Sequence, residues 1–245
     1  MKRRGILGSL HLLAAVFPAV AAPTLLRADG DHTPIGNAVN ALPIFDAHVH
    51  YKEPAWDAYP VESIIELMDR NGVAMALVSS TPDEGTIRLW EYAPRRIVPE
   101  LRPYHGAIGS SNWTKALGIE DYLSDRLDTY PHEGIGEFHI HQMDRLDEPL
   151  FREVIRMARE RDIFLHVHSG ALNPEWERII FAFPDRLMVG SDTWVNGQWD
   201  DYDDIISSNR AWLSLLPREI AEMIAFRNAE RAFGCDITMD LIGQK

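Results

Sequence analysis

The chain has 245 residues, 46% hydrophobic and 25% charged, which is enough for one large globular domain or two small ones and for a sizeable core. Its 24 basic and 37 acidic side chains give a formal net charge of −13, which argues against nucleic-acid binding because neutralising phosphates requires clustered Lys and Arg. Cys235 is the single cysteine, so no internal disulfide can form, and nothing near it in the sequence would activate it as a nucleophile.

Residues 1–21 have the pattern of an export signal. A basic start that includes Arg3 and Arg4 precedes an apolar stretch, and small residues before position 22 fit cleavage after Ala21. The two arginines also fit a twin-arginine signal loosely. We therefore expect an exported protein, periplasmic or extracellular, with no stable membrane span after cleavage. An uncleaved membrane anchor is the alternative.

Beyond the signal, short apolar runs alternate with amphipathic segments. Residues 22–41 are mostly polar and predict a disordered or loosely docked leader, followed by one domain at 42–245. Strands are predicted at 43–50, 73–80, 97–104, 134–141, 163–169 and 187–192. Helices are predicted at 60–71, 83–93, 118–129, 149–162, 173–183 and 208–233. This order predicts an α/β fold of βα units with a parallel sheet, which can close into a barrel whose catalytic residues lie at the carboxyl ends of its strands. An open doubly wound sheet is the alternative.

Six of the ten histidines form His-x-His pairs at the ends of predicted strands. The pairs are His48/His50, His139/His141 and His166/His168. Side chains at positions i and i+2 of a strand share a face, so each pair can direct two imidazoles at one spot. Neutral imidazole is a frequent ligand of zinc and similar metals. The pairs therefore predict a metal site.

Several segments resemble metal motifs of the amidohydrolase superfamily. The sequence DAHVH at 46–50 resembles its first-strand motif, and HVHSG at 166–170 resembles its fifth-strand motif. PDRLMVGSDTW at 184–194 resembles the eighth-strand motif, and GIGEFHIH at 134–141 resembles the fourth strand. The resemblance spans about residues 42–233 and is nearest to the amidohydrolase-related branch, which includes aminocarboxymuconate-semialdehyde decarboxylase-like enzymes and lactonases. It implies a TIM-barrel metal-dependent hydrolase.

Transferred onto this chain, the resemblance implies that His48, His50 and His168 bind the metal and that Asp192 is both a ligand and the general base. Glu137 lies where the family often has a carboxylate, and it is either a metal ligand or a residue that orients a ligand histidine. Three protein ligands and an open position suit a catalytic zinc, with manganese as the alternative. The structural alternatives are a turn or helix N-cap for Asp192 and buried core histidines.

Four further side chains are candidate substrate contacts, namely Arg102, His139, His141 and Trp194. The guanidinium of Arg102 can bind a substrate carboxylate in bidentate fashion, and a salt bridge to Glu100 or another acid is an equal alternative. Trp194 either lines the pocket or packs in the core. His166 lies one pleat deeper than the predicted fifth-strand ligand, which favours a packing or orienting role.

The family's barrel has eight βα units, whereas this sequence contains about six. Only one helix fits between Gly170 and Leu187, where the full pattern has two more strands, and no histidine follows His168. We infer an internal deletion near residues 169–172. The shortened barrel either closes with six strands or keeps open edges that invite pairing, so a homodimer is an open alternative.

Together these features predict a hydrolase that uses a metal-activated water to cleave a C–O or C–N bond of a small carboxylated molecule, such as a lactone or an amide. Metal-dependent nonoxidative decarboxylation with the same ligands is one alternative. Another is a catalytically inactive deletion remnant that only binds metal. A third is a periplasmic module that binds sugars or peptides without metal.

Overall fold

The computed structural model describes residues 33–139, 148–168, 180–181 and 184–244, without the side chains of residues 167 and 168. The predicted signal peptide, most of the leader, His141 and most of the predicted helix at 173–183 lie outside these residues. Among the residues described, no helix is both long enough and apolar enough to cross a lipid bilayer.

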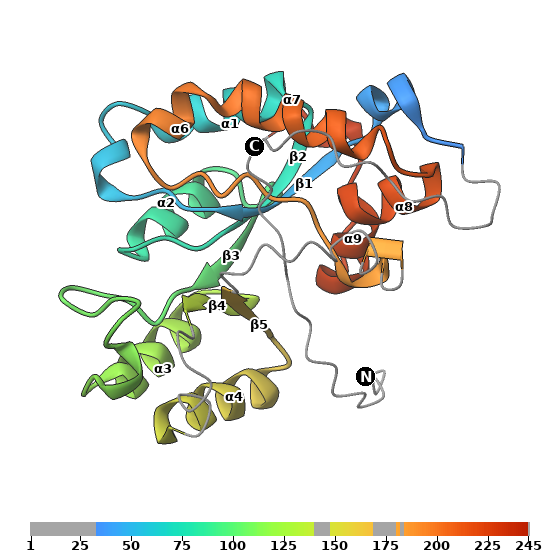
Figure 1. Ribbon diagram of the computed structural model, residues 1–245. Coiled ribbons are helices and arrows are strands. Elements are labelled where there is room, and N and C mark those ends of the chain that lie inside the picture. Colours follow the sequence, from blue (N-terminus) through green and yellow to red (C-terminus); the bar gives the residue numbers. More distant parts are fainter. Residues whose placement is uncertain (1–32, 140–147, 169–179, 182–183, 245) are drawn as a thin grey trace.

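Five parallel strands form one curled sheet in the order β1-β2-β3-β4-β5 (Figure 1). The strands are β1 (Ile44–Val49), β2 (Val73–Val78), β3 (Ile97–Leu101), β4 (Gly134–His139) and β5 (Phe164–His168). Successive strands are connected through α1 (Val61–Arg70), α2 (Glu84–Tyr92), α3 (Ile119–Thr129) and α4 (Pro149–Arg161). The prediction of an α/β fold built from parallel βα units is therefore confirmed, and the curled sheet forms a half-barrel.

The connecting helices follow their predicted apolar spacing. In α4, Phe151, Val154 and Met157 are buried on one side of the helix. Pro149 occupies the first turn, where its missing N–H leaves no bond unmade, and Asp162 ends the helix with a left-handed φ of 56°. This pattern of apolar spacing and end signals is why the four predicted helices agree with the structure to within two residues at each end.

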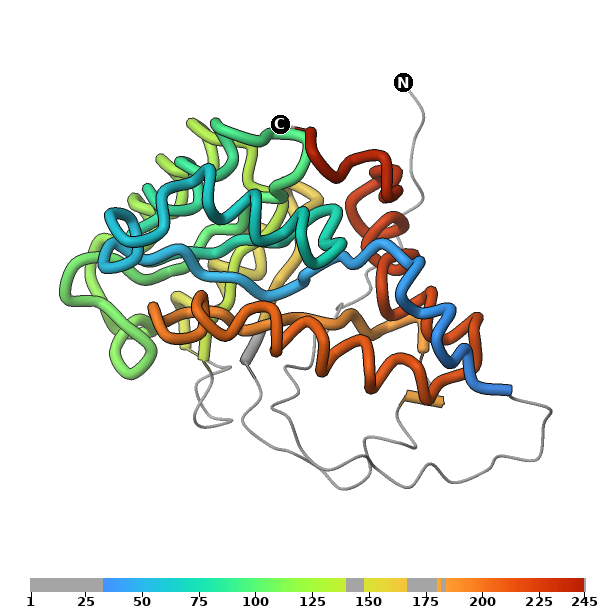
Figure 2. The backbone as a smooth tube through the Cα atoms, turned by 90° about the horizontal axis from the view of Figure 1, so that it is seen from above, coloured from blue at the N-terminus to red at the C-terminus, as the bar shows by residue number. Residues whose placement is uncertain are grey.

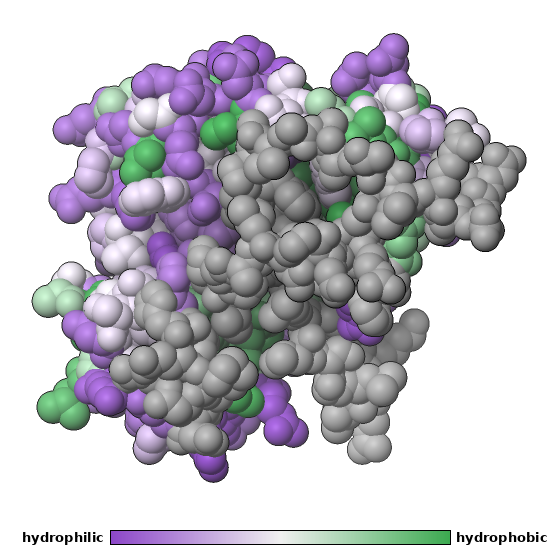
Figure 3. All heavy atoms as spheres, in the orientation of Figure 1, coloured by the Kyte–Doolittle hydropathy of each residue, from purple (hydrophilic) through white to green (hydrophobic). Residues whose placement is uncertain are grey.

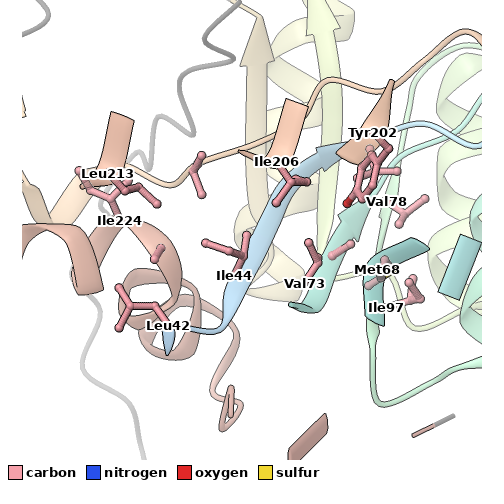
Figure 4. Close-up of a cluster of buried hydrophobic side chains, with 14 of the residues drawn as sticks. Leu42, Ile44, Met68, Val73, Val78, Ile97, Tyr202, Ile206, Leu213 and Ile224 are labelled. Carbon is pink, nitrogen blue, oxygen red and sulfur yellow. The ribbon is translucent and has the colours of Figure 1, made fainter. Parts of the chain in front are cut away.

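The convex side of β1 and β2 packs against α1 and three C-terminal helices. These helices are α6 (Asn196–Asp200), α7 (Tyr202–Leu213) and α8 (Arg218–Glu222), followed by a π-helical turn at Met223–Arg227. The last helix, α9 (Asn228–Phe233), lies on the other side of the sheet. In Figures 1 and 2, α7 runs along β1, and Figure 4 shows the apolar side chains between them. Outside this core, the visible surface over α6 and α7 is largely hydrophilic (Figure 3). The predicted helical region at 208–233 is thus divided into several helices, and the first of them begins earlier than predicted, at Asn196.

The predicted strand at 187–192 is wrong. Residues 187–193 run beside β1 on the edge opposite β2, but only Gly190 and Thr193 are bridge residues, and the Thr193 bridge to Val49 is isolated and parallel. The backbone bonds to β1 are Ala47 N–H to the Val189 carbonyl (2.9 Å), Asp192 N–H to the His48 carbonyl (2.8 Å) and His50 N–H to the Thr193 carbonyl (2.8 Å). An extra residue in β1 at this level interrupts the regular spacing that a strand ladder needs.

The expectation of a disordered or loosely docked leader is wrong for its last residues. Residues Gly36–Ala41 form a 3-10 helix in which Val39 is buried. The Ile35 N–H donates to the Leu216 carbonyl at 2.8 Å. Apolar side chains within this polar stretch thus attach it to the C-terminal helices.

The concave side of the half-barrel is apolar where the strands begin and polar where they end. Phe45, Met75 and Val98 pack there with residues of α9 and the C-terminal tail. The ring of Phe233, at the end of α9, lies 5.3 Å from the ring of Phe45 and 5.1 Å from that of Phe164. A helix thus fills the space between the first and fifth strands, below the polar end.

Candidate metal centre

Two imidazoles and two carboxylates converge at the carboxyl ends of the strands. The Nε2 atoms of His48 and His50 lie 3.0 Å apart. Asp192 Oδ1 lies 3.4 Å from the first of these nitrogens and 3.8 Å from the second. Glu137 Oε2 lies 3.3 Å and 3.5 Å from the same two atoms. The four side chains come from β1 and the residue that follows it, from β4 and from the segment 187–193, and they point at a common centre.

A β-bulge in β1 turns the two histidines inward. After Asp46, three steps along β1 match two steps along β2. Regular alternation would place Asp46 on the same face as His48 and His50. Instead, the buried Asp46 carboxylate faces outward and accepts a hydrogen bond from Tyr202 of α7 at 2.8 Å. The bulge therefore separates the DAHVH motif into an outward aspartate and two inward histidines.

The fourth strand carries a similar irregularity between Ile135 and Phe138. Phe138 packs into the outer core against α3 and α4, whereas its neighbour Glu137 faces inward, toward His48. Gly136 lies very close to β5, because a Cβ there would be 2.4 Å from the carbonyl oxygen of His166. A side chain at this position would push β4 and its glutamate away from β5.

The segment GSD at 190–192 is fitted closely against β1. A Cβ on Gly190 would lie only 2.8 Å from the Cβ of His48. The Ser191 N–H donates to Asp46 Oδ1 at 2.8 Å. Asp192 has a φ of 52°, a left-handed conformation that aspartate tolerates better than most residues. These contacts hold the Asp192 carboxylate beside the histidines.

The hydrogen bond of His50 fixes its tautomer. Its Nδ1 contacts the carbonyl oxygen of Ser79, which can only accept, so Nδ1 carries the hydrogen. The Nε2 lone pair then faces the centre, as a metal ligand requires. Ser79 Oγ lies 3.4 Å from His50 Nδ1 and also 3.4 Å from the backbone nitrogen of Glu137. Ser79 was missed in the sequence, since a serine after an apolar strand gives no distinct signal.

Burial and charge shift the two histidines in opposite directions. Burial and the charge of Arg102 lower the pKa of His50 to about 3, so its ring is neutral. Burial alone would also lower the pKa of His48. The hydrogen bond and charge of Glu137, together with the charge of Asp192, outweigh that effect and raise it. The cluster therefore favours a positive charge at its centre, which either a proton or a metal ion can supply.

The donor set fits a divalent metal ion. Around a tetrahedral zinc with bonds of 2.0–2.1 Å, neighbouring ligand atoms lie about 3.3 Å apart. The separations here, from 3.0 Å to 3.8 Å, bracket that value. His48, His50 and Asp192 offer ligand atoms that all lie within 4.8 Å of one another. A further ligand would come from Glu137 or from His168, a residue of β5 whose side chain lies outside the described part of the chain.

Arg102 is engaged with a candidate ligand rather than exposed to solvent. Its Nη2 lies 3.0 Å from Glu137 Oε2, and its Nε donates to the Glu137 carbonyl at 3.0 Å. Arg102 therefore forms a salt bridge, as one of the two alternatives expected, and its partner is Glu137 rather than Glu100. The guanidinium also lies 4.7 Å from the ring centre of Tyr104. Binding of a substrate carboxylate by Arg102 remains a prediction. Two of the guanidinium nitrogens, Nε and Nη2, already bond Glu137.

Two other histidines line the same end of the half-barrel. His139 is half-buried, and its Nδ1 lies 3.2 Å from the hydroxyl of Tyr104. His166 lies with Nδ1 3.0 Å from Glu100 Oε2, and its ring meets that of His48 edge-on at 4.9 Å. His166 thus contacts a candidate ligand, in the position that a packing or orienting role requires.

The outermost residues of the site are Trp194 and Lys52. Trp194 is 46% exposed, which excludes the core-packing alternative. The Lys52 ammonium lies 4.4 Å from its ring centre. Burial and the charge of Arg102 lower the pKa of Lys52, while Asp192 and Glu137 oppose that shift. Lys52 was missed in the sequence, although it follows His50 by two positions, the spacing used to group the histidines.

No model of a known protein family matches the chain, and no curated protein matches it. The functional argument therefore depends on the residues of the site.

Proposed function

We propose that the protein is a metal-dependent hydrolase that cleaves a C–O or C–N bond in a small lactone or amide. The main support for this proposal is the convergence of His48, His50 and Asp192 at the carboxyl ends of parallel strands. Their ligand atoms lie within 4.8 Å of one another. In this proposal the half-barrel is an amidohydrolase barrel shortened by two βα units, and the metal is zinc or manganese.

A divalent metal ion bound at this centre supplies Lewis acidity and lowers the pKa of a bound water. The side chain of Asp192 is 27% exposed, against 9% for His48 and 3% for His50. Asp192 is therefore the ligand that water and substrate reach. Its carboxylate accepts a proton from the attacking water and returns it to the leaving oxygen or nitrogen. The two histidines hold their lone pairs toward the centre during both transfers.

The test combines metal analysis with turnover. Purified full-length protein should contain stoichiometric zinc or manganese by mass spectrometry and should hydrolyse members of an ester, lactone and amide panel. Replacing both His48 and His50 with alanine should remove the metal, whereas His105→Ala, outside the cluster, should retain it. Asp192→Asn should lower turnover far more than metal content.

Two outcomes contradict the proposal. Wild-type protein without stoichiometric metal, or unchanged metal content in the double histidine variant, would eliminate the centre. Bound metal with no turnover on any substrate of the panel would eliminate the hydrolase. That second result would support a protein that binds metal without catalysis.

A further inference from the structure

Lys52 and Trp194 continue two neighbouring chain segments beyond the candidate ligands. Lys52 stands two positions after His50, and Trp194 stands two after Asp192. The segments are joined where the His50 N–H donates to the Thr193 carbonyl at 2.8 Å. Alternate residues of an extended chain share a side, and the backbone at Lys52 is extended. The Lys52 side chain therefore projects on the side of the candidate ligands, and the ring of Trp194 lies beside it, with its centre 4.4 Å from the ammonium.

The ammonium of Lys52 forms no ion pair with any residue that the structure describes. Within the described residues, no carboxylate oxygen lies within 4.0 Å of Nζ and no acceptor receives a hydrogen bond from it. The side chain is nevertheless half-buried, and the indole ring of Trp194 is its close neighbour at 4.4 Å. Partial burial of an unpaired ammonium costs free energy. A cation–π contact offsets only about 0.5–2 kcal/mol of such a cost.

The side chains of the site become more exposed to solvent with distance from the buried pair of Arg102 and Glu137. Arg102 and Glu137 are buried and paired with each other. Asp192 is 27% exposed at its side chain, and Trp194 is 46% exposed. A molecule that enters from solvent thus reaches Trp194 and Lys52 before the centre. Among the described residues near the centre, Arg102 donates to Glu137 through Nε and Nη2, whereas the ammonium of Lys52 donates no hydrogen bond.

We propose that Lys52, held against the indole ring of Trp194, binds the carboxylate of the substrate and so determines specificity for carboxylated molecules. Because Lys52 and Asp192 lie on neighbouring segments, a carboxylate at Lys52 leaves the rest of a small molecule within reach of the centre. The inference rests on the proposed function for the reaction at the centre, but its binding step can be measured separately.

The charges around Lys52 favour a monoanion. Asp192 and Glu137 both act on the Lys52 ammonium electrostatically. The same two carboxylates repel an anion that binds beside them, and the repulsion doubles for a dianionic phosphate. A carboxylate carries the single charge that one ammonium can neutralise.

The test uses two probes of the same shape, benzoate and neutral benzamide, titrated calorimetrically into full-length protein of measured metal content. Wild-type protein should bind benzoate at least about tenfold more tightly than benzamide. Lys52→Met should weaken benzoate binding by at least about tenfold and leave benzamide binding unchanged. Lys52→Arg should retain most of the benzoate affinity. Lys115→Met, which removes an exposed lysine elsewhere, is the matched control.

Equal binding of the two probes to wild-type protein, or no binding of either, overturns the proposal. Unchanged benzoate affinity in Lys52→Met also overturns it, because the carboxylate then binds elsewhere, for example at the metal. If Lys52→Met unfolds at a lower temperature, Lys52→Gln replaces it under the same criteria. Missing metal or turnover in wild-type protein contradicts the hydrolase alone, since Lys52-dependent discrimination between the probes is still measured.

Discussion

The Nε2 atoms of His48 and His50 lie 3.0 Å apart, although the two residues are separated only by Val49. On a regular strand the backbone advances about 6.7 Å over two residues, so the two rings must lean toward each other. They lean into a space that Glu137 and Asp192 also approach. Arg102 balances the charge of Glu137 from one side, and a proton or a metal ion at the centre would balance the charge of Asp192.

Gly190→Ala should damage the centre without touching a ligand. The new Cβ would lie 2.8 Å from the Cβ of His48, so β1 and the segment 187–193 would have to separate. We expect a loss of about 1–3 kcal/mol in the free energy of unfolding, measured in urea, and reduced metal content. Gly197→Ala is the matched control because a Cβ there meets nothing within 4 Å. Equal effects of the two changes would contradict the close fit.

Tyr202→Phe should destabilise the protein by removing a hydrogen bond to Asp46, the aspartate of the DAHVH motif that faces outward. The Tyr202 hydroxyl donates to the buried Asp46 carboxylate at 2.8 Å. Burial raises the pKa of Asp46, while its bonds with Ser191 and Tyr202 oppose the rise. Removing one donor should cost about 1–3 kcal/mol of unfolding free energy in a urea titration. Tyr59→Phe removes a hydroxyl that bonds the exposed Asp200 and should cost less than about 0.5 kcal/mol.

Arg96→Met should be among the most destabilising single substitutions. Arg96 is fully buried and donates to the carbonyls of Val73 (2.9 Å), Ala74 (2.5 Å) and Gln244 (3.0 Å). Its loss removes these three bonds and the ion pair with Asp69 at 2.8 Å, and we expect a cost of about 3 kcal/mol in the urea midpoint analysis.

Arg70→Met is the control for this change. Arg70 pairs with Asp203, but both side chains are at least half exposed, at 59% and 50%. Exposed ion pairs contribute less than about 1 kcal/mol. A similar loss for both arginine variants would show that the buried carbonyl contacts contribute little.

Cys235 should react slowly with thiol reagents. Burial raises the pKa of its thiol from 9.0 to about 11, so at pH 8 the folded protein has about a hundredfold less thiolate than an unperturbed cysteine. Alkylation by iodoacetamide should therefore accelerate as the pH rises from 8 toward 11, and unfolding in urea should restore ordinary reactivity at pH 8. Because the chain has one cysteine, mass spectrometry assigns every adduct. Rapid labelling of the folded protein at pH 8 would contradict the raised pKa.

Apolar periodicity was sufficient to predict the five strands and the four connecting helices. It could not predict the bulge after Asp46, because an extra residue in one strand depends on its pairing with another. The expectation that His48 and His50 share a face holds because the bulge precedes both of them. The predicted strand at 187–192 failed for the same reason, since an apolar run does not reveal how its neighbour spaces its hydrogen bonds.

The residues of the candidate site also separate into those that the sequence could identify and those that only the fold reveals. Histidines and Asp192 stand in recognisable motifs, so the sequence could group them. Ser79 contributes through a carbonyl contact and has no spacing signal of its own. Lys52 has the two-residue spacing from His50, but only the fold shows its proximity to Trp194. The partner of Arg102 could not be predicted from the sequence either, because Glu100 and Glu137 both face inward. Only the fold shows that Glu137 Oε2 lies 3.0 Å from Arg102 Nη2.

The position of Phe233 has a consequence for the order in which the protein folds. Its ring touches both Phe45 and Phe164, and Arg96 bonds the carbonyl of Gln244, so the first and middle strands depend on the end of the chain. A nascent chain cannot make these contacts until residues 233–244 have left the ribosome. We therefore expect the half-barrel to complete its folding only after this segment has emerged.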